Sequence, residues 1–210
     1  GLGTTLHHPR GEGGQGRDME RTDEELIREY LAGDGAAYTA LFPRHKGRIF
    51  NFALRMLANR AEAEDVTQET FIRLFEKRYQ ETQQAKLSTW LFTVARNACL
   101  TRLRSRKLLQ PLWFKRSVTG ELEEWDIPDT ADPPSGVLQQ KELTRRIRQA
   151  IAALPEDQRE ALILREYEKK DYAEIAQILG CALSKVKIDI FRGREALRAN
   201  LTAFLKEDRP

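Results

Sequence analysis

Residues 171–198, DYAEIAQILGCALSKVKIDIFRGREALR, decide the fold that we expect for this chain. Asp171, followed three residues later by Glu174, has the pattern of a capping box at a helix N-terminus. Gly180 suits the left-handed conformation that ends many helices, because glycine has no Cβ atom. Four apolar side chains have the spacing that fills the wedge between two crossing helices: Ile175, Leu179, Val186 and Ile190. The stretch therefore predicts a helix-turn-helix, with small Ala176 where the helices cross.

The second helix of this pair is basic along much of its length. Its cations are Lys185, Lys187, Arg192, Arg194 and Arg198. The second helix of a DNA-binding helix-turn-helix lies in the major groove, where cations contact phosphates and other side chains read base edges. An ordinary helical hairpin with a solvated, charged surface is the alternative. The cap, the glycine turn, the apolar wedge and the basic face occur together, which favours DNA binding.

The composition fits a small globular protein of one or two domains. The chain has 210 residues, of which 40% are hydrophobic and 32% are charged. It has no apolar run of membrane-spanning length and no signal-peptide pattern, so we expect no membrane insertion and a cytoplasmic location. Cys99 and Cys181 stand apart from each other and from any histidine, which favours packed thiols and predicts no metal site and no cofactor. No catalytic constellation is found, so we expect neither an enzyme nor a small-molecule substrate.

Helical periodicity on both sides of an irregular segment predicts an all-α protein with two small helical domains. Residues 102–116 carry six bases, and residues 117–140 carry six acids and no base. A basic helix end that is followed by an acidic, proline-bearing segment is typical of a domain boundary. We therefore expect an N-terminal domain over residues 19–109, an acidic flexible linker over 110–137 and a C-terminal domain over 138–210. The glycine-rich residues 1–18 are interpreted as a disordered tail or an extension foreign to the natural chain.

Two N-terminal segments carry further patterns. AEDVTQETFIRLF, residues 63–75, has an apolar stripe that includes Val66, Phe71 and Phe75, with polar residues beside it. LSTWLFTVARNACLTRLRSRK, residues 87–107, ends in a cluster of cations that suits phosphates of single-stranded nucleic acid. Taken alone, each pattern also fits a solvated helix end whose charges favour the helix dipole. Pro43 is expected to kink or interrupt the helix that precedes these segments.

Taken in order, these segments closely resemble the extracytoplasmic-function sigma factors of bacteria, a group within the sigma-70 family. The resemblance covers residues 22–206 and includes LPEDQREALILREYEKKDYAEIAQILG, residues 154–180. It implies an initiation subunit of RNA polymerase that consists of two helical domains. It also implies three partners: the polymerase core, promoter DNA and an anti-sigma factor that restrains the protein.

The resemblance assigns roles to residues in both domains. Contact with the clamp helices of the polymerase core would come from Asp65, Gln68, Glu69 and Arg73. Contact with the −10 element, together with the loop 83–86, would come from Arg96, Asn97, Arg102, Arg104 and Arg106. Contact with the −35 element would come from Lys185, Lys187, Ile188, Asp189, Phe191 and Arg192.

The basic helix departs from the common pattern of the family at Ile188, Asp189 and Gly193. A carboxylate can accept a hydrogen bond from the amino group of cytosine, and an isoleucine can touch the methyl group of thymine. We therefore expect Asp189 and Ile188 to contribute to −35 specificity. Two other functions compete with the sigma factor: a self-sufficient helix-turn-helix regulator that binds duplex DNA alone, and a nucleic-acid-processing enzyme.

Overall fold

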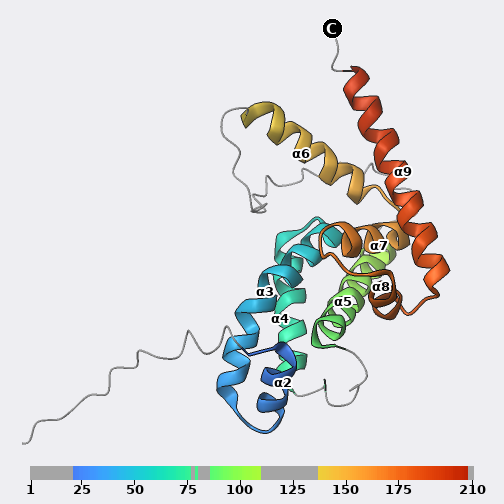
Figure 1. Ribbon diagram of the computed structural model, residues 1–210. Helices are drawn as coiled ribbons and strands as arrows, with labels where there is room; N and C mark the ends of the chain where they lie inside the picture. Colours follow the sequence, from blue (N-terminus) through green and yellow to red (C-terminus); the bar gives the residue numbers. More distant parts are fainter. Residues whose placement is uncertain (1–20, 77–78, 80–85, 110–136, 208–210) are drawn as a thin grey trace, which may run out of the picture. The chain divides into compact units, whose positions relative to one another are not determined.

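A computed structural model describes residues 21–76, 79, 86–109 and 137–207 (Figure 1). Every regular element within these residues is a helix, which confirms the expected all-α fold class. The helices are α2 (Asp23–Leu31), α3 (Gly35–Leu57), α4 (Arg60–Phe75), α5 (Leu87–Leu109), α6 (Val137–Ala152), α7 (Glu156–Glu166), α8 (Tyr172–Leu179) and α9 (Leu183–Glu207). None of the helices in the described part of the chain is long and apolar enough to cross a membrane.

The chain divides into two compact units, and the division falls between Arg44 and His45 inside α3. Helix α3 continues through Pro43, so the expected interruption there is wrong. The second unit contains α4 to α9, which includes both of the segments that we expected to form separate domains. The expected tail over residues 1–18 and almost all of the expected linker lie outside the described residues. The domain boundaries at 109 and 138 therefore remain predictions.

The first unit contains α2 and the start of α3. Thr22 caps α2 through a full capping box: its hydroxyl accepts from the backbone N–H of Glu25, and the Glu25 carboxylate accepts from the Thr22 backbone N–H. Tyr30 and Tyr38 pack with ring centroids 5.4 Å apart. Gly33 has a φ of +112°, a conformation that favours glycine, and it lies in the turn between the two helices.

The second unit has a core of aliphatic and aromatic side chains from several helices. The rings of Phe52 on α3 and Phe92 on α5 meet edge to face with centroids 5.5 Å apart. Phe71 on α4 is 2% exposed, and Leu162 on α7 is 2% exposed. Helix α4 packs on α5, and α7 packs on both α8 and α9. These contacts fix the positions of α5 and α9, the two helices that carry most of the expected DNA-binding residues.

The helix-turn-helix predicted from residues 171–198 is confirmed in its details. Asp171 forms the capping box of α8 with Glu174, and Gly180 ends the helix in the left-handed region with φ 63° and ψ 39°. The four expected wedge residues are at most 8% exposed: Ile175, Leu179, Val186 and Ile190. Helix α9 then begins at Leu183 and continues to Glu207.

Candidate nucleic-acid interface

The first half of α9 presents a face that is both cationic and apolar. Five of the six residues expected to contact the −35 element are exposed on this helix: Lys185, Lys187, Ile188, Phe191 and Arg192. Ile188 is 47% exposed and Phe191 is 65% exposed, although both are large and apolar. Val186 and Ile190, on the other side of the helix, are fully packed against the rest of the domain. The packing of one side therefore fixes which side of α9 can meet a binding partner.

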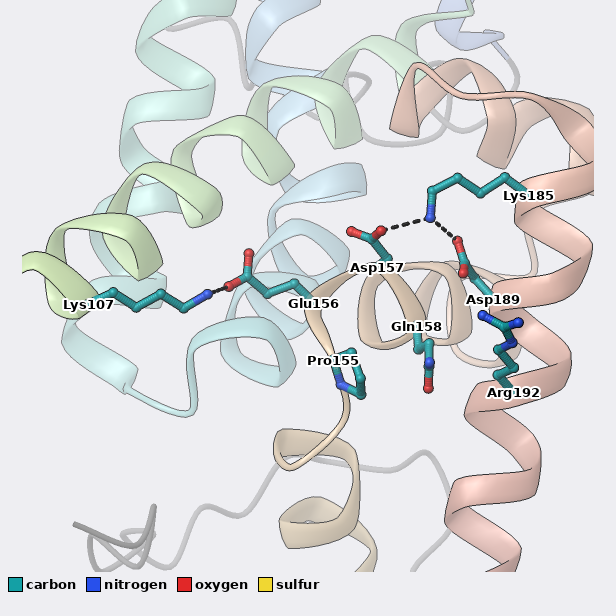
Figure 2. Close-up of a pocket in the computed structure, with 8 residues that line it drawn as sticks. All are labelled: Lys107, Pro155, Glu156, Asp157, Gln158, Lys185, Asp189 and Arg192. Atoms are coloured by element: carbon teal, nitrogen blue, oxygen red, sulfur yellow. Dashed lines mark hydrogen bonds and ion pairs between the residues drawn. The ribbon is translucent and has the colours of Figure 1, made fainter. Parts of the chain in front are cut away.

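Asp189 does not belong to that exposed face. Its side chain is 8% exposed, and its carboxylate accepts a hydrogen bond from Lys185 Nζ at 2.7 Å. Lys185 Nζ also donates to Asp157 on α7 at 2.7 Å, so one ammonium group joins two carboxylates (Figure 2). These two hydrogen bonds raise the pKa of Lys185 above its usual value. Direct readout of a cytosine by Asp189 does not fit this arrangement, in which the carboxylate holds the start of α9 against α7.

An open hollow of about 440 Å³ lies beside this ion pair. Its walls come from the end of α5, the first turn of α7 and the start of α9, and they consist of Lys107, Pro155, Glu156, Asp157, Gln158, Lys185, Asp189 and Arg192 (Figure 2). The walls contain equal numbers of cationic and acidic side chains. Most of these charges already pair with one another, so the hollow favours neither an anionic nor a cationic ligand.

Three of the five residues expected at the −10 element bind carboxylates within the protein. Arg96 makes a bidentate contact with Glu160 on α7, with N–O distances of 2.8 and 2.9 Å. Arg102 donates to Glu69 on α4 at 3.2 Å, and Arg106 donates to Glu62 on α4 at 2.6 Å. The last two contacts stay within the N-terminal helices and hold α5 on α4. The Arg96 contact instead ties α5 to the helices of the C-terminal segment.

Asn97 and Arg104, the other two residues expected at the −10 element, are exposed on α5. Asn97 lies next to Arg96 along the helix, and Arg104 lies two turns further on. Within the described residues, the ion pairs that join α5 to α4 and α7 come instead from Arg96, Arg102, Arg106 and Lys107. An exposed amide can read a base edge, and an exposed guanidinium can bind a phosphate. These two residues could therefore meet a nucleic acid without a change in the present side-chain pairing.

Helix α4 carries the residues expected to contact the polymerase core. Asp65, Gln68 and Arg73 are exposed, whereas Glu69 is half-buried and pairs with both Arg73 and Arg102. The Glu69–Arg73 pair, at 2.7 Å, is an ordinary contact between residues four apart on a helix. Glu69 thus has a structural role in the described fold, because it also holds α5 through Arg102.

Sequence reasoning missed two apolar residues on the exposed side of α4. Ile72 is 56% exposed and Phe75 is 62% exposed, so the placement of Phe75 in the buried stripe is wrong. A helix advances by about 100° per residue, which puts Gln68, Ile72 and Phe75 on the face opposite Val66. This helical angle can be worked out from the sequence alone, and it predicts that Phe75 does not share the buried face of Val66. The contact surface that we expected on α4 to be polar therefore also includes two apolar side chains, Ile72 and Phe75.

Comparison with protein families places both segments in one family. Residues 41–108 match the model described as Sigma-70 region 2, and residues 144–197 match the model described as Sigma-70, region 4. The first match ends at the basic end of α5, and the second contains α8, the turn after it and the first part of α9. We therefore call residues 41–108 region 2 and residues 144–197 region 4.

The chain is also similar over most of its length to characterised proteins. It is 33% identical over 185 residues to the ECF RNA polymerase sigma factor SigW of Bacillus subtilis, covering 87% of this chain and 98% of that protein. It is 31% identical over 192 residues to the RNA polymerase sigma-H factor of Pseudomonas aeruginosa, covering 90% of this chain and 98% of that protein.

Two solved structures share the fold. CnrH, in complex with the cytosolic domain of CnrY, aligns with a TM-score of 0.62 and 21% identity over 89% of this chain and 99% of that one. The sigma factor RpoE of Bartonella quintana, in complex with the anti-sigma factor NepR, aligns with a TM-score of 0.57 and 23% identity over 82% of this chain and 98% of that one. From the matched regions and the full-length relatives together, the chain belongs to the extracytoplasmic-function sigma factors of the sigma-70 family.

Proposed function

We propose that this protein directs the core of bacterial RNA polymerase to specific promoters and starts transcription there. Family membership supports the activity, and the helix-turn-helix in region 4 carries the proposal for how DNA is read. Region 4 would bind the −35 element, and region 2 would bind and open the −10 element. The protein would work in the cytoplasm, where the polymerase and the chromosome are.

The observation that carries the −35 assignment is the exposed face of α9. Lys187 and Arg192 supply positive charge for phosphates or for guanine, whose O6 and N7 atoms are acceptors in the major groove. Ile188 and Phe191 supply apolar surface for the methyl group of thymine. Large apolar side chains are costly to expose unless a partner covers them. Lys185 and Asp189 act differently in this proposal: they hold the start of α9 on α7 and position the reading face.

The −10 assignment concerns α5. Asn97 would bind the edge of an unpaired base, and the arginines along the helix would bind the backbone of the separated strand. Arg104 is exposed for this purpose, whereas Arg96, Arg102 and Arg106 are paired with carboxylates in the described structure. The expected loop at 83–86 lies outside the described residues apart from Lys86.

The core-binding assignment concerns the exposed face of α4. Asp65 and Gln68 would make polar contacts with the polymerase, and Ile72 and Phe75 would add an apolar centre. Interfaces between proteins commonly combine an apolar centre with a polar rim. Glu69 and Arg73 would lie at the edge of this surface. The charged side chains described on α4 and α5 thus form two groups. Some pair with one another and hold the fold, and the others are exposed and can contact a partner.

We also propose that an anti-sigma factor restrains the protein. Both CnrH and RpoE were solved with a second protein bound: the cytosolic domain of CnrY in one case, and NepR, which is named as an anti-sigma factor, in the other. The mixed apolar and cationic face of α9 and the face of α4 are surfaces that such a partner could cover.

Footprinting with and without the polymerase core tests the proposed function against the alternative regulator. The DNA is a library of fragments from the genome that encodes this chain. A sigma factor is expected to protect promoter fragments only when the core is present. A self-sufficient regulator would protect its sites alone, and that result would refute the proposal. A Lys187→Ala, Arg192→Ala variant should lose protection upstream while it still binds the core.

A further inference from the structure

Two arginines of α5 bind two glutamates of α4 in the folded protein. Arg106 donates to both carboxylate oxygens of Glu62, from Nη2 at 2.6 Å and from Nε at 3.2 Å. Arg102 donates from Nη1 to Glu69 at 3.2 Å. All four side chains are half-buried, so solvent and salt screen these pairs less than they screen fully exposed pairs. We call the two contacts the α4–α5 ion pairs.

Arg106 also reaches the corner between α3 and α4. Its Nη1 atom donates to the carbonyl oxygen of Leu57, the last residue of α3, at 2.9 Å. Ala58 follows with a φ of +49°, in the left-handed region that residues other than glycine rarely adopt. The Asn59 side chain then caps α4 by accepting from the backbone N–H of Glu62 at 2.9 Å. One guanidinium group therefore holds the end of α3 and the first turn of α4 on either side of a strained corner.

Both glutamates lie at one edge of the surface of α4 that we propose to bind the polymerase. We call that surface the polymerase-binding face, and it consists of Asp65, Gln68, Ile72 and Phe75. A helix advances by about 100° per residue, so Glu62 and Glu69 lie on one line along α4, about a quarter of a turn from the middle of this face. Their separation along the helix axis is about 10 Å. Two anchored points at this spacing limit the rotation of α4 about its axis and thereby set the direction of the polymerase-binding face.

The buried face of α4 offers limited packing to fix this rotation by itself. Three of its six buried residues are small: Ala63, Thr67 and Thr70. Both threonine hydroxyls donate to carbonyl oxygens of α4, at 2.7 and 2.8 Å, so they do not bond to α5. Small side chains let helices approach closely, but they form shallower ridges than branched or aromatic side chains do. The α4–α5 ion pairs therefore add directional contacts at the edge of a smooth buried face.

We propose that Arg102 and Arg106 are positioning residues for polymerase binding, which set the direction of the polymerase-binding face, and are not contacts to the −10 strand. This inference rests on the proposed function, in which α4 binds the polymerase core. Each of the three side-chain nitrogens of Arg106 already donates to a protein oxygen. Arg104, which is exposed on the same helix, is then the residue of this stretch that binds a strand phosphate.

Four single substitutions in the full chain test the proposal. Arg106→Gln and Glu62→Gln each break the first ion pair, and a double variant combines them. Arg60→Gln is the matched control, because it removes a cation from an exposed pair with Glu64 in the first turn of the same helix. Arg104→Gln is the contrasting variant, because it removes an exposed cation of α5. Biolayer interferometry gives the Kd for purified polymerase core, and circular dichroism shows whether each variant is folded at the assay temperature.

Arg106→Gln and Glu62→Gln should each raise the Kd for the core by about fivefold or more, whereas Arg60→Gln and Arg104→Gln should leave it within about twofold. The double variant should bind no more weakly than Arg106→Gln alone, because two substitutions that break one pair are not additive. A folded Arg106→Gln protein with an unchanged Kd would overturn the proposal, even if its Tm were lower. If Arg106→Gln is unfolded, Glu62→Gln is compared with Arg60→Gln under the same criteria, since it leaves the bond from Arg106 to Leu57 in place.

A salt titration of promoter binding separates positioning from strand contact. Holoenzyme is formed with each chain at a concentration that saturates the core, and the affinity for promoter DNA is measured over a range of salt concentrations. Loss of one phosphate contact lowers the slope of log K against log salt by about one. Arg104→Gln should show this lower slope, and Arg106→Gln should keep the wild-type slope. A lower slope for Arg106→Gln would assign it to the strand and overturn the proposal.

The same measurements separate this inference from the proposed function. A wild-type chain that binds the core and, as holoenzyme, binds promoter DNA supports the proposed function. If that holds while Arg106→Gln and Glu62→Gln both bind the core as tightly as the wild type, the positioning role alone is refuted. A folded wild-type chain that does not bind the core would refute the proposed function and this inference with it.

Discussion

Replacement of Asp189 by alanine distinguishes a positioning role from a base-reading role. The Asp189 carboxylate is 8% exposed at its side chain, and its hydrogen bond to Lys185 Nζ is 2.7 Å long. A hydrogen bond to a charged group contributes about 1.5–3 kcal/mol when buried, whereas exposed pairs four apart contribute about 0.3–0.5 kcal/mol. The Lys185 side chain is 46% exposed, so solvent screens the pair. We therefore use the lower end of the range for buried hydrogen bonds.

We therefore expect Asp189→Ala to lower the free energy of unfolding by about 1 kcal/mol, after the better helix propensity of alanine is taken into account. For a chain of this size, that loss corresponds to about 2–4 °C in Tm, which differential scanning calorimetry measures. Lys185 keeps its contact with Asp157, so α9 should stay folded. The base preference at the −35 element should change little, and the affinity should fall about equally for all promoters.

The pH dependence gives a second check on the same variant. The contacts raise the pKa of Lys185, so their stabilisation is complete below the unfolded pKa of lysine, about 10.4, and is lost as the pH rises through the higher folded pKa. The difference in Tm between the wild type and Asp189→Ala should therefore be constant from about pH 6 to 9 and shrink only in strong alkali. An unchanged Tm together with relaxed preference at one −35 base would refute the positioning role and restore direct readout.

Three further variants and one chemical modification have expected effects of their own. Gly193→Ala should raise stability by about 0.5–1 kcal/mol, because its Cβ would lie at an ordinary 3.4 Å from the Gln158 carbonyl oxygen and alanine favours a helix; thermal melts measure this. Arg159→Met should lower stability by about 2 kcal/mol in urea titrations, because its guanidinium donates to the carbonyls of Met56, Ala152 and Leu154. Ile72→Ser with Phe75→Ser should weaken binding to the polymerase core by at least about tenfold in biolayer interferometry and leave Tm within about 2 °C. Burial raises the pKa of the Cys99 thiol to about 12, so iodoacetamide at about pH 8 should leave Cys99 unmodified in folded protein and alkylate it after denaturation, as mass spectrometry detects.

The sequence was most informative where a local pattern fixes a local structure. The capping box at Asp171, the glycine end at Gly180 and the packed wedge residues are all decided by a few neighbouring side chains, and the structure agrees with each. The family resemblance added the order of the segments, and the comparisons confirm the family. Pro43 shows a limit of local rules, because α3 continues through it.

The direction of a side chain was harder to predict. The burial of Asp189 depends on Lys185 and on Asp157 of α7, which lies 28 residues before Lys185 in the chain. The pairing of Arg96 with Glu160 joins residues 64 apart in the sequence. Long-range pairs of this kind depend on how helices pack, and no periodicity in one segment reveals them. The sequence therefore predicted that the helices are charged, but only the structure assigned a role to each charged side chain.

Promoter-specific initiation is the central claim, and run-off transcription tests it most directly. Purified polymerase core is supplied with genomic fragments of the organism that encodes the chain, with and without the protein, and the 5′ ends of the transcripts are sequenced. We predict new start sites that appear only with the protein and share two upstream sequence elements. Lys187→Ala with Arg192→Ala should lose most of these starts. A control variant, Glu64→Gln with Glu195→Gln, removes two carboxylates from exposed ion pairs and should keep them. No new start sites in the presence of folded, core-bound protein would contradict the assignment as a sigma factor.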